Sequence, residues 1–321
     1  MISRLPDFIA DSVLSDRQPA AAIVGGTGYR LPMQADQAES IMDAYSGRPV
    51  ALLTQHGKEQ VLAQPLERAL GCRVQLVTGY DTDQLGSFTR EIPRAGTQLG
   101  AARKKARIGM ERSGLSLGLA SEGSYGPDPF SGLFPWNTEI LVWFDDEREL
   151  EVIGVAQGKA NFAHLLAPEW AAVEAFAKQV RFPEQHLVLR PDGEQDLRIC
   201  KGIGRWEDLH TAFFCALADS ANGLVFVETD GRAHANPARM EIIRRAGEDL
   251  ARKLCSCCPV CATPGFWIVE RVVGLPCQAC GAPTGEVLCE VHGCLKCAYR
   301  IDHLRHGPPY ADPGRCAYCN P

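Results

Sequence analysis

The sequence lacks the features that would place the chain in a membrane or on nucleic acid. Within its 321 residues, no apolar run approaches the roughly 18 residues that a membrane span requires. The first residues, MISRLPDFIADSVLSD, carry scattered acids and no apolar segment of the kind found in secretory signals. The formal net charge of −6 argues against a general polyanion binder, which would show a basic footprint. We therefore expect a cytoplasmic protein that does not act at a membrane.

Cysteine is nearly absent from the first 250 residues and abundant after them. Only Cys72, Cys200 and Cys215 stand in the earlier part, singly and in apolar surroundings, as small core residues do. The other cysteines lie in the last 70 or so residues, a segment rich in Gly and Pro. A segment this short needs a staple to fold, and in a reducing cytosol clustered cysteines indicate metal rather than disulfides.

Four C-x-x-C pairs in this segment predict two structural zinc ions. A C-x-x-C turn points two thiolates at one tetrahedral ion, and two such turns close a four-thiolate site that performs no chemistry. There are 15 residues between Cys261 and Cys277 and 18 between Cys297 and Cys316, which favours pairing of sequence neighbours over a cross-braced arrangement. The expected zinc ligands are Cys258, Cys261, Cys277, Cys280, Cys294, Cys297, Cys316 and Cys319.

Some alternatives for this segment stay open. Cys257 could replace Cys258 as a ligand, and three histidines are further donors that we expect at the surface: His292, His303 and His306. The basic and acidic residues after residue 250 are nearly balanced, which is weak support for nucleic-acid binding. Structural capping or docking of a protein partner fits this balance at least as well.

The pattern of elements divides the chain into three parts. Residues 1–47 are an N-terminal extension, residues 48–250 alternate strand-like and helix-like segments, and residues 251–321 form the zinc-binding region. The alternation predicts an α/β fold, a sheet with flanking helices. The plainest helices are a basic amphipathic segment over Thr97–Ser113 and a last helix with Asn236 as its N-cap.

Two short segments of the α/β part are candidates for chemistry. The turn TQHGKE follows a buried strand and offers Lys58 and backbone N–H groups to a phosphate, although a solvated lysine would give the same pattern. The stretch GLASEGSYGPDP places one acid, Glu122, among residues too small to cover it, in what we interpret as a loop at a strand end. Such an acid is either incidental to a turn or bound to metal near phosphate, and we favour the second interpretation.

A charged loop over residues 79–98 has no hydrophobic periodicity. It holds Asp81, Asp83, Arg90, Glu91 and Arg94. A solvated surface loop would carry such charges. Acids alternating with arginines beside a strand end could instead bind Mg²⁺ and phosphate together.

A last cluster lies in VFVETDGRAHANPARM, where a strand passes into the final helix. Its members are Glu228, Asp230, Arg232, His234 and Arg239. Arg232 and His234 could bind phosphate near the helix N-terminus, while Glu228 and Asp230 could equally cap and solubilise a turn. In WNTE, Glu139 is a further Mg²⁺ candidate.

Three blocks in order, TQHGK (54–58), GTQLGAARKKA (96–106) and LASEGS (119–124), resemble the inosine/xanthosine triphosphate pyrophosphatase superfamily, including its non-standard purine NTP phosphatase branch. The resemblance implies a mixed α/β fold with a long central cleft and Mg²⁺-dependent attack by water on a nucleoside triphosphate. It also implies that Lys58 holds phosphate, that Lys105 sits on a cleft-facing helix and that Glu122 binds metal or activates water.

The sequence departs from that superfamily at two points. The asparagine of its first turn is Gln55 or His56 here, and the carboxylate of its helix is replaced by Leu99 and Gly100. A metal site without that acid needs another donor, and the charged loop supplies the nearest ones.

From about residue 47 to residue 321, the chain also resembles a bacterial family known only as a domain of unknown function, through segments such as GRPVALLTQHGKE and CAYCNP. We predict a metal-dependent phosphohydrolase acting on a nucleotide or related phosphate ester. The alternative is a non-catalytic nucleotide-binding or protein-interaction module.

Overall fold

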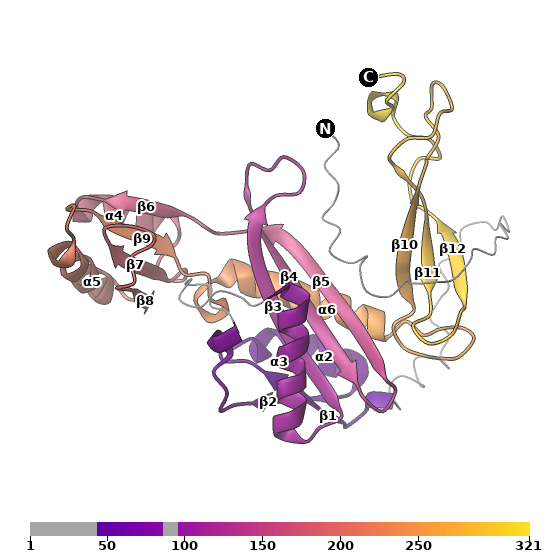
Figure 1. Ribbon diagram of the computed structural model, residues 1–321, viewed down its shortest axis with the longest axis horizontal. Helices are drawn as coiled ribbons and strands as arrows, with labels where there is room; N and C mark the ends of the chain where they lie inside the picture. The colour runs from indigo at the N-terminus through magenta and orange to yellow at the C-terminus, as the bar shows by residue number, and fades with distance from the viewer. Residues whose placement is uncertain (1–43, 86–95) are drawn as a thin grey trace. The chain divides into compact units, whose positions relative to one another are not determined.

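The computed structural model describes residues 44–85 and 96–321, apart from the side chain of Asp83 (Figure 1). One compact unit comprises Tyr45–Arg252, and a second includes Lys253–Pro321. Among the described residues, no helix combines the length and apolar character needed to cross a membrane. The expected mixed sheet and flanking helices are confirmed, whereas the central cleft stays a prediction.

The first unit is built on a five-stranded mixed sheet with the order β2-β1-β3-β4-β5. Strand β1, second in this order, runs parallel to both β2 and β3, and the β3-β4-β5 part is antiparallel. Four of the five residues of β1 are buried, because a strand covered on both faces must be apolar throughout. The strands are β1 Pro49–Leu53, β2 Arg73–Val77, β3 Leu117–Pro127, β4 Pro135–Asp145 and β5 Leu150–Lys159.

Helix α3 (Gln98–Ser113) covers one face of this sheet, as the sequence predicts for this segment. The Thr97 side chain caps it by accepting from the N–H of Gly100 at 3.0 Å. Its small residues allow close packing: an ideal Cβ at Gly109 would lie 3.2 Å from the Cβ of Leu53. Ala102 and Ala106 pack in the same layer against residues of β3 and β4.

Helices α2 (Glu59–Leu70) and α6 (Pro237–Leu254) lie on the opposite face (Figure 1). An ideal Cβ at Gly154 of β5 would be 2.6 Å from the Cβ of Leu250, so α6 packs directly on the sheet. An ideal Cβ at Gly247 of α6 would lie 3.0 Å from the Leu62 Cδ2 of α2, so the two helices also pack on each other. Asn236 is the predicted N-cap: its Oδ1 accepts from the N–H of Arg239 at 3.0 Å.

A four-stranded antiparallel sheet in the same unit has the order β6-β9-β7-β8. Two helices, α4 (Trp170–Gln179) and α5 (Trp206–Asp219), contribute to one core with it. The last of these four strands along the chain, β9, ends at Thr229 and leads through residues 230–236 into α6. The strands are β6 His164–Ala167, β7 Leu187–Pro191, β8 Cys200–Ile203 and β9 Val225–Thr229.

The second unit contains a three-stranded antiparallel sheet, β10-β11-β12. Its core is small, and the cysteine turns stand at the ends of its strands. The strands are β10 Trp267–Val273, β11 Val287–Gly293 and β12 Arg300–Leu304. Short 3-10 turns complete the described structure: η1 Thr82–Leu85, η2 Ala233–Ala235 and η3 Pro313–Arg315.

Candidate functional site

The expectation that Glu122 lies in a loop is wrong. Strand β3 continues through the small residues as far as Pro127, paired with β4 from Leu117↔Asp145 to Pro127↔Pro135. Glycine and serine have low intrinsic strand preference, so the sequence suggests a loop, but the long partner strand β4 supplies the ladder. Glu122 is therefore a buried strand residue, 2% exposed.

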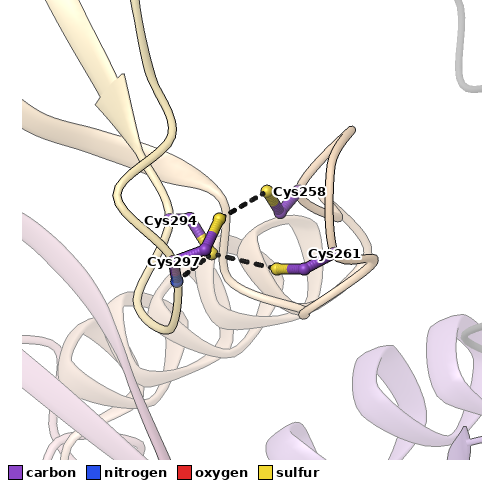
Figure 2. A group of neighbouring side chains, drawn as sticks. All are labelled: Cys258, Cys261, Cys294 and Cys297. Atoms are coloured by element: carbon purple, nitrogen blue, oxygen red, sulfur yellow. Dashed lines mark hydrogen bonds between the residues drawn. The ribbon is translucent and has the colours of Figure 1, made fainter.

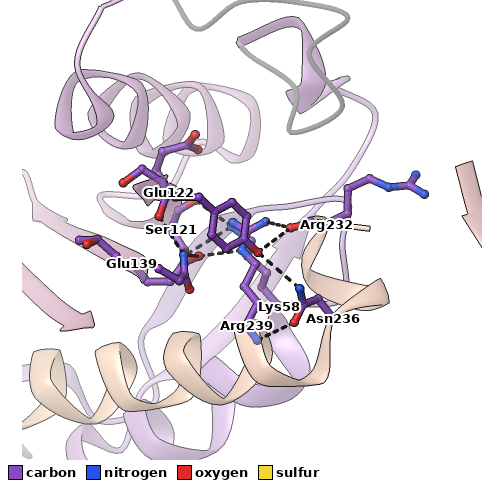
Figure 3. A network of polar contacts seen from close by, with 12 residues as sticks. Lys58, Ser121, Glu122, Glu139, Arg232, Asn236 and Arg239 are labelled. Atoms are coloured by element: carbon purple, nitrogen blue, oxygen red, sulfur yellow. Dashed lines mark hydrogen bonds and ion pairs between the residues drawn. The ribbon is translucent and has the colours of Figure 1, made fainter. Parts of the chain in front are cut away.

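Lys58 is buried at the carboxyl end of β1 rather than solvated. Gly57 adopts a left-handed conformation, φ 68°, and turns the chain so that Lys58 starts α2. The Lys58 Nζ donates to the carbonyl oxygen of Ser121 at 3.1 Å and to its Oγ at 3.3 Å (Figure 3). A serine of β3 thus holds the ammonium group inside the protein.

Glu139 of β4 connects this lysine to α6. Its Oε2 accepts from the Ser121 Oγ at 3.3 Å, and its Oε1 accepts from the Arg239 Nε at 2.7 Å (Figure 3). The Asn137 Nδ2 donates to the same Oε1 at 3.3 Å. The Arg239 Nη1 donates to the carbonyl oxygen of Gly231 at 2.7 Å, so the arginine also fixes the chain between β9 and α6. We call Lys58, Ser121, Glu139 and Arg239 the buried network.

Glu122, the other predicted acid, forms an ion pair outside the buried network. Side chains alternate along a strand, and residues paired across two strands share a face. Glu122 is the register partner of Ile140, which packs in the α3 layer, so Glu122 also faces α3. Ser121, the residue before Glu122, therefore faces α6. The Glu122 Oε2 accepts from the Lys105 Nζ of α3 at 2.5 Å. Glu122 and Glu139 therefore lie on opposite faces of the sheet.

The electrostatics of the buried network are unbalanced. It holds two cations, Lys58 and Arg239, and one carboxylate, Glu139, all with less than a tenth of their surface exposed. Burial first, and then the charge of Arg239, lowers the pKa of Lys58 to about 7. Burial also raises the pKa of the adjoining Tyr125 to about 12, so it stays a neutral hydroxyl whose OH donates to the carbonyl oxygen of Gly231 at 3.3 Å.

Arg232 and His234 lie between β9 and α6, near this network. The Arg232 Nη2 pairs with the Asp230 Oδ2 at 2.5 Å, and Asp230 is completely buried. The His234 ring stacks on His56 of the TQHGKE turn, with centroids 5.2 Å apart. Burial, and then the charge of Arg232, lowers the pKa of His234. Two distant predicted segments therefore meet here.

The remaining predicted residues belong to the charged loop and to β9. Asp81 is exposed at the start of η1. Arg90, Glu91 and Arg94 lie outside the described residues, as does the side chain of Asp83. Glu228 pairs with a buried arginine of β7, Arg190.

The sequence analysis did not select Ser121, and it named Arg239 in the last cluster without giving it a role. Ser121 stands beside the chosen Glu122, and strand alternation would have separated their faces had the segment been assigned to a strand. Arg239 lies three residues after the N-cap of α6, and its burial, which is unusual for an arginine, is visible only in the structure.

The cysteines form two tetrads, each with four Sγ atoms within 4.8 Å of one another. The first tetrad is Cys258, Cys261, Cys294 and Cys297, and the second is Cys277, Cys280, Cys316 and Cys319 (Figure 2 shows the first). Sγ atoms paired across the turns lie 3.5–3.8 Å apart. Four sulfurs at about 2.3 Å from a tetrahedral zinc ion would be about 3.8 Å apart, whereas a disulfide would need about 2 Å. The donor set therefore fits a tetrahedral metal ion.

The preferred pairing of sequence neighbours is wrong: the tetrads are cross-braced. The first C-x-x-C turn precedes β10 and the second follows it, so the two lie at opposite ends of a strand about 20 Å long. Trp267 at the start of β10 pairs with Gly293 at the end of β11, which brings the first and third turns together. The second and fourth turns lie at the other end. Cys257 belongs to neither tetrad.

Across residues 44–85 and 96–321, only the two cysteine tetrads bring three or more metal-ligating side chains together, with ligand atoms within 4.8 Å of one another. In this described part, the carboxylates supply no such group. The expected Mg²⁺ ligands Glu122 and Glu139 are each ion-paired, on opposite faces of the sheet.

Fold and site together define an α/β protein with a buried polar network in one unit and a cross-braced, metal-binding cysteine sheet in the other. The model of the family described as Domain of unknown function (DUF6671) matches residues 105–321. The chain belongs to this family, whose description names no activity. The search of curated proteins finds no match.

Proposed function

We propose that the first unit is a phosphohydrolase that acts on a nucleotide or a related phosphate ester. The observation that carries the proposal is the excess of buried cations, since Lys58, Lys105 and Arg239 are buried with two carboxylates, those of Glu122 and Glu139. An uncompensated buried cation is costly unless it loses its proton or meets an anion. A phosphate group supplies that anion and accepts hydrogen bonds from lysine and arginine side chains.

The place of the network in the sheet supports the same proposal. Strand β1 is followed by α2 on the α6 face, and β2 is followed by α3 on the opposite face. The connections diverge at the carboxyl end of β1, where Lys58 stands. In open α/β sheets, ligands bind at such switch points, outside the carboxyl ends of the strands.

The resemblance of TQHGK, GTQLGAARKKA and LASEGS to the inosine/xanthosine triphosphate pyrophosphatase superfamily adds the substrate class. In the structure, these blocks form the turn after β1, the start of α3 and the middle of β3. They contribute Lys58, Lys105 and Ser121 to neighbouring positions on two faces of one sheet. A nucleoside triphosphate is therefore the first substrate to test.

Among the described residues, the carboxylates do not form a group that could hold Mg²⁺, so the reaction is described without a protein-bound Mg²⁺ ion. Mg²⁺ would instead enter bound to the phosphates of the nucleotide substrate.

The test is hydrolysis by the purified full-length protein. A panel of standard and deaminated nucleoside triphosphates with Mg²⁺ is assayed for phosphate and pyrophosphate release, with the wild type compared with Lys58→Met. Lys104→Met is the matched control, because Lys104 is an exposed lysine on α3. We expect release by the wild type and the control and its loss in Lys58→Met. Equal background release by all three proteins overturns the proposal. Thermal stabilisation by a nucleotide without any product would instead identify a binding module.

For the second unit, we propose that each cysteine tetrad binds one structural zinc ion. Four thiolates at tetrahedral spacing are the donor set of closed zinc sites, and the three short strands bury little apolar surface of their own. Metal analysis of the protein should give two zinc ions per chain, and a value below one contradicts the assignment.

A further inference from the structure

Ser121 and Lys58 have the geometry of a nucleophile and its base. The Lys58 Nζ lies 3.3 Å from the Ser121 Oγ, within hydrogen-bond reach. Serine is a weak nucleophile by itself and is activated by an adjacent base that removes its proton. Lysine can serve as that base only where its surroundings disfavour the charged form, and Lys58 is buried with only 6% of its surface exposed.

A third group orients this pair. The Glu139 Oε2 lies 3.3 Å from the same Ser121 Oγ, and Arg239 and Asn137 hold the Glu139 carboxylate in place. The Lys58 Nζ is fixed from a second direction by the carbonyl oxygen of Ser121 at 3.1 Å. Nucleophile, base and orienting acid come from three separate elements, β3, the turn after β1, and β4. The contact between nucleophile and base is the one that recurs in nucleophilic catalysis, but the acid here contacts the nucleophile rather than the base.

We propose that Ser121 is a catalytic nucleophile that attacks the phosphorus of a phosphate ester, with Lys58 as its general base and Glu139 as a positioning residue. The inference rests on the proposed function and adds a covalent intermediate to it.

The chemistry balances in two steps. In the first, the neutral Lys58 amine takes the Ser121 proton, a bond forms between Oγ and phosphorus, and the bond from phosphorus to the leaving oxygen breaks. The leaving group takes the proton back from Lys58 and departs as an alcohol or a shortened phosphate. In the second, water gives a proton to Lys58 and attacks the phosphoserine, and the serine oxygen recovers that proton as phosphate leaves. No electrons are transferred to or from another reagent.

A fluorophosphonate probe tests the nucleophile directly and without a known substrate. An activated serine displaces fluoride from the probe and forms a stable bond from Oγ to phosphorus. We expect the full-length wild type to be labelled at Ser121, identified by peptide mass spectrometry, and Ser121→Ala to remain unlabelled. Ser124→Ala, a change on the same strand whose hydroxyl contacts Gln98 instead, should be labelled at the wild-type rate.

Two further variants separate a base from a structural cation. Lys58→Met should lower the labelling rate roughly 10²-fold or more, the usual contribution of a general base. Lys58→Arg retains the positive charge but cannot act as a base near neutral pH, so it should be equally slow. Labelling of Lys58→Arg at the wild-type rate overturns the role of Lys58. A cooperative thermal unfolding transition above the assay temperature in each variant shows that slow labelling is not a loss of fold.

The pH profile is an independent readout. The charges that act on Lys58 are those of Glu139 and Arg239 in the buried network, and those of the Lys105–Glu122 pair on the opposite face of the sheet. Arg239 and Lys105 lower the pKa of Lys58 and the two carboxylates raise it, after burial has lowered it most. The wild-type labelling rate should therefore increase as pH rises through about 7 and then level off.

The outcomes distinguish the inference from the function on which it rests. Turnover of a phosphate ester without labelling of Ser121 overturns the nucleophile and leaves a phosphohydrolase in which water attacks directly. Labelling of Ser121 without turnover of any phosphate ester supports the nucleophile and overturns the substrate class. If the protein shows neither turnover of a phosphate ester nor labelling of Ser121, the proposed function and the proposed nucleophile are both wrong.

Discussion

Gly123 of β3 lies directly against the carboxylate of Glu139 on β4. The two residues are register partners, and an ideal Cβ at Gly123 would be 2.1 Å from the Glu139 Oε1 and 2.5 Å from the Arg239 Nη2. Real side chains do not approach so closely. The glycine therefore makes room for an ion pair that folds over the strand, and the small residues around Glu122 have a packing cause.

Gly123→Ala should weaken the buried network. The added methyl group must displace the carboxylate or the guanidinium, and such overpacking costs about 1–3 kcal/mol. We expect a lower midpoint of urea unfolding and loss of activity in the same variant. Gly126→Ala is the matched control on the same strand, because a Cβ there meets nothing within 4 Å. Equal midpoints for the two variants would show that the contact of Gly123 with Glu139 and Arg239 does not contribute to the free energy of unfolding.

The buried lysine makes stability depend on pH in a defined window. The pKa of Lys58 is about 7 in the folded protein and near 10.4 in an unfolded chain. Between these values, the unfolded state binds the proton and the folded state does not, so the unfolding free energy contributed by Lys58 rises with pH, by at most about 1.4 kcal/mol per pH unit. Below about pH 7 both states are protonated and the contribution is constant.

The measurement is the unfolding free energy of the wild type relative to Lys58→Met between pH 6 and pH 10 (roughly the span of the two pKa values). The variant removes the ionisable group and should be favoured most at the acid end, with the wild type gaining on it as pH rises above about 7. Parallel curves would mean that Lys58 keeps its proton in the folded protein.

Much of the fold could be predicted because its signals are local. The leucine spacing of α2, its Gly71 stop with φ 66°, and the Asn236 cap all act within one or two turns of helix. The course of β3 could not be predicted, because Gly123 and Ser124 pair in a strand only through the ladder from β4. The cross-bracing of the cysteines likewise depends on which strand ends meet.

The site was predicted in part for the same reason. The turn with Lys58 and the strand with Glu122 stood out as polar residues after apolar runs. The face that each residue takes follows from strand register, which one sequence does not reveal, and register separates Glu122 from Glu139. Arg239 comes from an element about a hundred residues further along the chain.

Arg239→Met should be among the most destabilising single changes in the first unit. It leaves Glu139 as a buried carboxylate without its guanidinium partner, and breaking a buried pair from one side typically costs about 3–5 kcal/mol. The double variant Arg239→Met with Glu139→Gln should recover part of that loss, since the remaining buried charge is gone. Lys178→Met, which breaks an exposed pair with Glu174, should change stability by less than about 0.5 kcal/mol. A similar loss in Lys178→Met and Arg239→Met would contradict the buried role.

Metal content of paired cysteine variants tests the cross-bracing. Cys258→Ser with Cys294→Ser removes two ligands from one tetrad, so the protein should keep one of its two zinc ions. Cys258→Ser with Cys277→Ser removes one ligand from each tetrad, so both sites should weaken and both ions should be lost to a moderate chelator. Pairing of sequence neighbours requires the reverse result, with the second variant keeping one ion and the first losing both. Cys200→Ser, a change outside both tetrads, should retain two ions.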